Sequence, residues 1–190
     1  MDLFKAINER WSCRNYLPDP VDEDTIIKLI EAGTQAPSPA NNQPWEFVVI
    51  AGDGVKKKIF EESLRCKKVL YERSGWKWLD SYQVGFLMEV PVLIAVIGDP
   101  QKSGADLFLE KGGLSYQHAC AAAIQNILLA AHALGLGSLW YTLFDQNAMR
   151  EILGIPKEKV PLALICIGRP AGEPFKTKRK DIREKVTFIR

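Results

Sequence analysis

The sequence is poor in metal-binding residues and has little excess charge of either sign. Its 190 residues include only two histidines, His118 and His132, and four cysteines, none of which form a C-x-x-C pair. Zinc sites are built from clustered Cys and His ligands, so we expect no metal site. The net charge of +2 at pH 7 argues against a protein built mainly to bind nucleic acid or acidic membranes. We therefore expect neither nucleic acid nor membrane as a partner.

Segments that would carry the chain into or across a membrane are also missing. The opening residues MDLFKAINERW are charged throughout and contain no apolar signal-peptide core. The longest apolar run, VPVLIAVIG at 90–98, is too short to span a bilayer. The cysteines lie far apart, and two of them lie in apolar runs, where Cys behaves as a small hydrophobic residue. We expect reduced cysteines and a cytoplasmic protein.

What the sequence does contain is typical of a globular fold. Hydrophobic residues make up 47% and charged residues 25% of the chain. A chain of this length can bury most of its apolar surface without metals or disulfides, so we expect one domain over residues 1–190. Helix-like and strand-like segments alternate irregularly, which favours an α+β fold with a sheet flanked by helices.

Caps and hydrophobic periodicity predict the individual elements. Asp2, Asp22 and Asp145 stand at expected helix N-termini, and Ile26, Ile27 and Ile30 form the expected buried stripe of the second helix. The expected helices are 2–10, 22–33, 55–72, 115–134 and 146–154, and the expected strands are 46–52, 90–99, 139–144 and 160–170, with 185–190 as a candidate edge strand. The helix over 115–134 contains seven alanines, which predicts burial on all sides or close packing against a second helix.

The segment APSPANNQPWEF at 36–47 concentrates turn-forming residues between a helix and a strand. Its three prolines and two asparagines predict a rigid loop, with Trp45 and Phe47 holding its exit in the core. A rigid loop presents polar groups at set positions with little ordering cost on binding.

No catalytic motif is visible, but pieces of an anion site are. Arg10, Ser12 and Arg14 alternate along an extended segment, so they can point the same way, and two guanidiniums with a hydroxyl suit a phosphate. The basic residues Lys178 and Arg179 supply a second cationic contact. On these patterns alone a solvated surface is the more frequent explanation. Phosphate anchors without acid–base machinery favour a cofactor that carries the chemistry.

Four segments, in order along nearly the whole chain, resemble the FMN-dependent nitroreductase family. They are ERWSCRNY at 9–16, APSPANNQPWEFVV at 36–49, AAIQNILLAAHALGLGSLWYT at 122–142 and IGRPAGEPFKTKRKDI at 167–182. The resemblance implies an intertwined homodimer of α+β sandwich subunits, each with a central, mostly antiparallel sheet flanked by helices, and two FMN sites at the interface. Electrons would pass from NADH or NADPH to FMN and then to a nitroaromatic, quinone or related small-molecule acceptor, by a ping-pong mechanism.

The resemblance also assigns cofactor-binding roles to residues of this chain. It implies that Arg10, Ser12 and Arg14 hold the phosphate, ribityl chain and pyrimidine side of FMN, with Lys178 and Arg179 at the phosphate. Pro37, Ser38 and Asn41 would approach the flavin from the partner subunit, with Gln43 at the same rim. Trp140, Tyr141, Thr142 and Leu143 would line the other side of the ring, although relatives often have glycine or an acid after the tryptophan.

Two other functions share these motifs. One is oxygen-dependent cleavage of FMN, as in the enzymes that make dimethylbenzimidazole, and the other is flavin binding or storage without turnover. The region 66–82 matches no family motif, and we expect it to shape the acceptor pocket. Its aromatic residues Trp76, Trp78 and Tyr82 can stack on an aromatic acceptor, although packing is the more frequent role for such residues.

Overall fold

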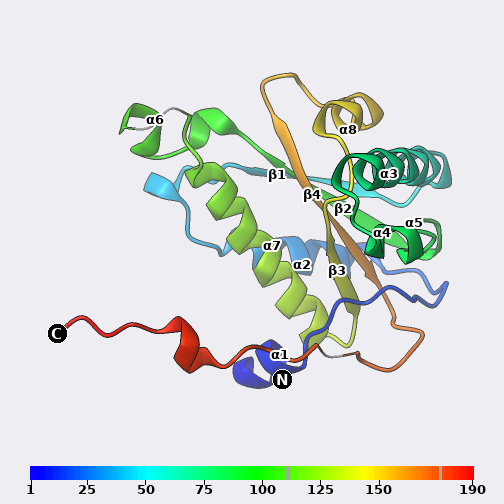
Figure 1. Ribbon diagram of the computed structural model, residues 1–190, viewed down its shortest axis with the longest axis horizontal. Coiled ribbons are helices and arrows are strands. Elements are labelled where there is room, and N and C mark those ends of the chain that lie inside the picture. The colour runs from blue at the N-terminus through cyan, green and yellow to red at the C-terminus, as the bar shows by residue number, and fades with distance from the viewer. Residues whose placement is uncertain (110–111, 176) are drawn as a thin grey trace.

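The centre of the protein is an antiparallel sheet of four strands, seen in a computed structural model that describes residues 1–109, 112–175 and 177–190 (Figure 1). The strand order is β1-β2-β4-β3, and each neighbouring pair is antiparallel. The strands are β1 Trp45–Ile50, β2 Val92–Gly98, β3 Gly137–Tyr141 and β4 Val160–Gly168. With helices on both sheet faces, this arrangement confirms the α+β fold and the antiparallel sheet that the sequence predicts.

The central strands follow from their composition. Every residue of β2 is buried, as expected for a nearly continuous apolar run covered on both faces. The strand expected at 139–144 is shifted, because β3 starts at Gly137 and ends at Tyr141. Beyond Tyr141 the chain turns, with the Phe144 N–H donating to the Thr142 carbonyl at 2.9 Å, so that Asp145 can begin the next helix.

The helices form two layers around the sheet (Figure 1). The long helix α7, Ser115–Ala133, and α2, Glu23–Thr34, cover one face and share a hydrophobic cluster with it. The other face carries α3 Asp53–Ser74, α4 Trp78–Ser81, α5 Phe86–Glu89 and α8 Gln146–Leu153. Shorter pieces complete the chain: α1 Leu3–Glu9, η1 Pro39–Asn41, η2 Pro100–Lys102, α6 Asp106–Leu109 and η3 Ile182–Lys185.

The predicted caps are confirmed, and the predicted stripe of the second helix is only partly right: Ile26 is buried and Ile30 packs against the core. The side chains of Asp2, Asp22 and Asp145 accept hydrogen bonds from backbone N–H groups in the first turns of α1, α2 and α8. On α2, however, Ile27 is 47% exposed while Leu29 is fully buried. The buried face follows Ile26, Leu29 and Gly33, the i, i+3, i+7 row, and at Gly33 it meets Ile127 of α7.

The C-terminal segment does not form the candidate edge strand at 185–190. Its last element is the short helix η3, after which the chain extends away from the body (Figure 1). The outer edge of β3, where an added strand would pair, is partly occupied by Ser12, which bridges Ser138. Within the described residues, no helix is long and apolar enough to cross a membrane.

Candidate functional site

The first part of the candidate site is the segment that follows α1. It runs along the outer edge of β3, where Ser12 bridges Ser138 and the Cys13 N–H donates to the Ser138 carbonyl at 3.0 Å. Cys13 is fully buried while Ser12 and Arg14 are exposed, so the predicted alternation of side chains is present. Burial raises the pKa of the Cys13 thiol, which is consistent with a packing role. Pairing with the sheet therefore aims the polar residues outward.

Two arginines that are far apart in the sequence, Arg10 and Arg179, lie close enough for their charges to interact. Partial burial, and then the positive charge of Arg179, lower the pKa of the Arg10 guanidinium. Among the residues that the structure describes, Arg10, Arg14 and Arg179 form no ion pair with a carboxylate. Lys178, next to Arg179 in the chain, is exposed. Clustered cations without counter-charges form a site for an anion.

The second part of the site is the end of β3. Four predicted residues, Trp140 to Leu143, line a cavity of about 340 Å³ together with Arg14. Trp140 and Thr142 are exposed, while Tyr141 is buried with its ring edge-on to Phe86, their centroids 5.7 Å apart. The structure thus places residues 14 and 140–143 around one cavity.

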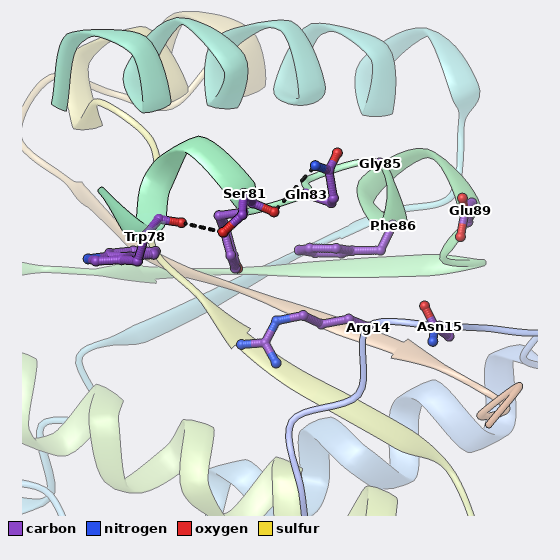
Figure 2. A pocket seen from close by; sticks show the side chains of 9 residues that line it. Arg14, Asn15, Trp78, Ser81, Gln83, Gly85, Phe86 and Glu89 are labelled. Atoms are coloured by element: carbon purple, nitrogen blue, oxygen red, sulfur yellow. Dashed lines mark hydrogen bonds between the residues drawn. The ribbon is translucent and has the colours of Figure 1, made fainter. Parts of the chain in front are cut away.

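The same cavity is lined by Trp76, Trp78 and Tyr82, for which the residue pattern favoured packing. Trp76 and Trp78 are instead 52% and 53% exposed. A neighbouring hollow of about 580 Å³ lies between Trp78, Phe86 and Glu89 (Figure 2). Arg14 borders both hollows, with its guanidinium carbon 5.8 Å from the centre of the Tyr82 ring. The segment over 76–89 therefore overhangs Arg14.

The third part of the site is the loop after α2. Ala40, Asn41 and Gln43 have φ angles of 48°, 55° and 45°, and they are the non-glycine residues with positive φ in the described chain. Such conformations are disfavoured and tend to gather where a ligand is held. Inside the loop the Gln43 N–H donates to Ser38 Oγ at 3.0 Å, and the Gln43 side-chain amide donates to Asn41 Oδ1 at 3.4 Å. The predicted rigid loop is present.

Sequence reasoning missed what holds this loop in place. The Asp106 carboxylate accepts hydrogen bonds from the N–H groups of Gly104 and Ser115 and from the Ser103 hydroxyl, while the Ser103 carbonyl accepts one from the Asn42 amide at 3.2 Å. Burial alone would raise the pKa of Asp106, but these backbone hydrogen bonds hold it well below its usual range. Asp106 lies nine residues before Ser115, whereas a capping side chain binds N–H groups two or three residues away. The spacing along the sequence therefore gave no signal for this contact.

Within one subunit the loop lies apart from the other two parts. Pro37 and Ser38 pack against the first half of α7, beside Ser115, His118 and Ala122. The α1 segment lies at the other end of α7 (Figure 1), which has 19 residues and is therefore about 28 Å long. The predicted site residues thus form two sets, one on 10–14, 140–143 and 179, and the other on 37–43.

Comparison with known proteins identifies the fold and the family. The model of the Nitroreductase family matches residues 7–169. A provisionally named NADH dehydrogenase/NAD(P)H nitroreductase of Methanothermobacter thermautotrophicus is 33% identical over 178 residues, which are 92% of this chain and 80% of that protein. The 5,6-dimethylbenzimidazole synthase of Rhodospirillum rubrum is 30% identical over 168 residues, or 86% of this chain and 80% of the synthase.

A solved structure connects this fold with a flavin. It is a provisionally named nitroreductase from Desulfovibrio desulfuricans in complex with FMN. It matches with a TM-score of 0.76 and 26% identity, covering 100% of this chain and 98% of that one. No three His, Cys, Asp or Glu side chains in the described ranges gather as a metal site would require.

Proposed function

Because the chain belongs to the nitroreductase family, we propose that it is an FMN-dependent oxidoreductase. It passes electrons from NADH or NADPH to a nitroaromatic, quinone or similar small-molecule acceptor by a ping-pong mechanism. When bound, FMN supplies the redox chemistry, taking two electrons from the donor and delivering them to the acceptor. The whole chain, 1–190, is proposed as a single FMN-binding domain of a cytoplasmic protein.

The observation that carries the proposal is the pair Arg10 and Arg179, whose positive charges interact. A phosphate monoester carries a charge of about −1.5 to −2 at pH 7, so it matches two guanidiniums that form no ion pair with any carboxylate of residues 1–109, 112–175 and 177–190. Ser12 adds a hydroxyl beside them, and Lys178 a further cation. These groups hold the FMN phosphate in our proposal.

The position of Arg14 suits the other end of the same molecule. An extended chain rises about 3.3 Å per residue, so Arg10 and Arg14 stand roughly 13 Å apart, which separates a phosphate anchor from a ring contact. Arg14 opens onto the cavity lined by Trp140 to Leu143. A guanidinium there favours added negative charge on the pyrimidine side of the ring. We propose these five residues as the ring-binding set.

The separation of the two site sets supports a homodimer. A loop about 28 Å along α7 from its own cation cluster can reach the cluster of a second subunit whose α7 runs antiparallel beside it. The α7 stripe of His118, Gln125 and Leu129 is at least partly exposed. Exposed apolar side chains on α1 and on the tail, such as Phe4 and Phe188, offer further surface for a partner. In this arrangement Pro37, Ser38, Asn41 and Gln43 serve the partner's flavin.

The proposal is tested by the flavin itself. The purified protein should be yellow and release FMN on denaturation, and its visible absorbance should bleach when NADH or NADPH is added without oxygen. Sedimentation of the flavin-loaded protein should show a dimer. A protein that binds no FMN even after reconstitution would overturn the assignment, and a flavin-loaded monomer would overturn the dimer.

A second candidate is oxygen-dependent cleavage of FMN. It is favoured by the 30% identity to the dimethylbenzimidazole synthase, which covers 86% of this chain. After anaerobic reduction the protein would be exposed to oxygen and its products separated. Release of dimethylbenzimidazole would favour this activity over acceptor reduction. Bound FMN that neither nucleotide reduces would instead indicate a flavin-storage protein or a different electron source.

A further inference from the structure

We propose that Trp76, Trp78 and Tyr82 form a stacking platform that favours a planar aromatic electron acceptor. The inference rests on the proposed oxidoreductase function and names residues that determine its specificity. The platform consists of Trp76, Trp78 and Tyr82, on α4 and the turns around it.

In the segment over 76–82, the largest side chains are the more exposed ones. Leu79 is fully buried, whereas the two larger indoles beside it are about half exposed. Burying one more large aromatic side chain would ordinarily stabilise the fold. A segment that buries its leucine and turns two tryptophans outward presents them to a ligand.

The rings are arranged as a surface rather than scattered. The Trp76 and Trp78 rings are stacked, with centroids 6.1 Å apart and planes inclined by 28°. Tyr82 meets Trp78 edge-on, with centroids 5.6 Å apart. Offset stacking and edge-to-face contacts are the favourable geometries for aromatic groups, and a planar ligand extends such an array.

The platform is held in position by the rest of the structure. Gly75, with φ of 65°, ends α3 in the left-handed conformation, and the Trp76 N–H donates to the Ser74 hydroxyl at 3.1 Å. Lys67 Nζ on α3 donates to the Asp80 carbonyl at 3.1 Å. Little ordering is therefore left for binding, which favours affinity.

We expect the electron acceptor to bind on the platform because the platform faces the proposed position of the flavin ring. Trp76 and Trp78 share the cavity of about 340 Å³ with Arg14 and Trp140 to Leu143, the set proposed for the flavin ring. The flavin ring would take the part of this cavity beside Trp140 to Leu143, and the acceptor the part beside Trp76 and Trp78. Trp78 and Tyr82 also border the neighbouring hollow of about 580 Å³, which leaves room for a small ligand there. The walls of the smaller cavity are mainly aromatic and apolar, which favours a flat aromatic molecule over a sugar or an inorganic ion. The loop that would meet the partner subunit's flavin lies elsewhere, against α7.

The test compares two acceptors with and without the platform. 1,4-Naphthoquinone takes two electrons and two protons to give the hydroquinone, with one NADH or NADPH supplying two electrons and one proton and water the other proton. Ferricyanide takes one electron, so two are reduced per nucleotide, and it needs no aromatic surface. The double variant Trp76→Ala/Trp78→Ala should lower kcat/KM for naphthoquinone by about 10- to 100-fold, with ferricyanide changed less than about twofold.

Control variants and a binding measurement complete the design. Trp76→Phe/Trp78→Phe should restore most of the naphthoquinone activity, and Tyr71→Ala, which removes an exposed aromatic outside the cavity, should change nothing. Equilibrium dialysis of 2-naphthol, a two-ring molecule that is not an electron acceptor, should show the same loss of affinity in the alanine double variant. Naphthol binding needs no electron donor, so it tests the platform even if neither nucleotide reduces the enzyme. Failure of both nucleotides to reduce the flavin would overturn the proposed function and leave the platform standing.

Two results would overturn the platform. One is unchanged naphthol binding and naphthoquinone activity in the alanine double variant. The other is an equal loss for naphthoquinone and ferricyanide at full FMN content, which would mean general damage to the site rather than lost stacking.

Discussion

The two sets of proposed site residues, at opposite ends of α7, are held in opposite ways. Arg10, Ser12 and Arg14 are charged or polar side chains on ordinary extended backbone that pairs with the edge of β3. The loop over 37–43 carries no charged side chain, and its backbone takes strained angles at Ala40, Asn41 and Gln43. The first set thus presents charged side chains from unstrained backbone, whereas the loop presents neutral groups from strained backbone.

Because of this difference, we expect the two sets to contribute to FMN binding in different ways. Charge-assisted hydrogen bonds to a phosphate are strong individually, so the cationic set should determine how tightly FMN is held. A rigid neutral loop contributes by needing little ordering, so its effect should depend on its backbone and on what supports it. Truncating side chains of the first set should therefore weaken FMN binding. For the loop, FMN binding should instead be weakened by removing the groups that hold its backbone in place.

The largest expected effect is loss of the phosphate anchors. Arg10→Ala or Arg179→Ala should each weaken FMN binding by about 100-fold, because a charged hydrogen bond to phosphate is lost. The affinity is measured by titrating FMN into flavin-free protein and following flavin fluorescence. Arg73→Ala, at the exposed end of α3, is the matched control and should bind FMN normally. Normal affinity in both anchor variants would remove the phosphate assignment.

The next largest effect is expected from a substitution that weakens the proposed dimer and so separates the two sets of site residues. Ala122→Arg introduces a charged side chain on α7, where the loop packs. It should shift the protein toward monomer and lower FMN affinity by roughly tenfold, because a buried unpaired charge is costly at an interface and each flavin loses its partner loop. Sedimentation and FMN titration give the two readouts. Lys68→Glu on α3 is the control for an added charge change, and a fully dimeric Ala122→Arg protein would contradict the interface.

A smaller effect is expected from the support of the loop. Asp106→Asn removes a carboxylate that ties Ser103, Gly104 and Ser115 together, so FMN affinity should fall by about three- to tenfold. The folded pKa of Asp106 lies below its usual value, so its stabilisation is complete above about pH 4 and is lost as pH falls further. Thermal unfolding from pH 6 to pH 3 should show a shallower decline for the variant. Parallel curves would exclude this role.

The smallest effect is expected from relieving the strain itself. Ala40→Gly removes the steric cost of a φ of 48° but adds backbone entropy to the unfolded chain, so stability should change by less than about 1 kcal/mol. FMN affinity should change less than about twofold, since no contact atom beyond one Cβ is lost. Urea unfolding and FMN titration check both. A tenfold loss of affinity would mean that the Ala40 methyl group itself contacts the ligand.

Local signals in the sequence predicted most of the fold. Asp22 and Asp145 marked helix starts because capping acts over three residues, and β2 was visible because burial on both faces demands an unbroken apolar run. The α2 stripe was only partly right, since Ile27 and Leu29 are both apolar and only docking against α7 decides which one is buried. The end of β3 was missed because Thr142 and Leu143 suit a strand until Asp145 starts a helix.

The sequence by itself determined the longer helices and most of each strand, their caps, the loop over 36–47 and the alternation that aims Ser12 and Arg14 outward. These are properties of a few neighbouring residues, and local sterics and periodicity are enough to specify them. Only the tertiary structure decided that Arg10 and Arg179 lie near enough for their charges to interact, that the loop over 37–43 lies at the other end of α7, and that Trp76 and Trp78 stay exposed. Such placements depend on how distant segments pack around one sheet, which no spacing along the chain encodes.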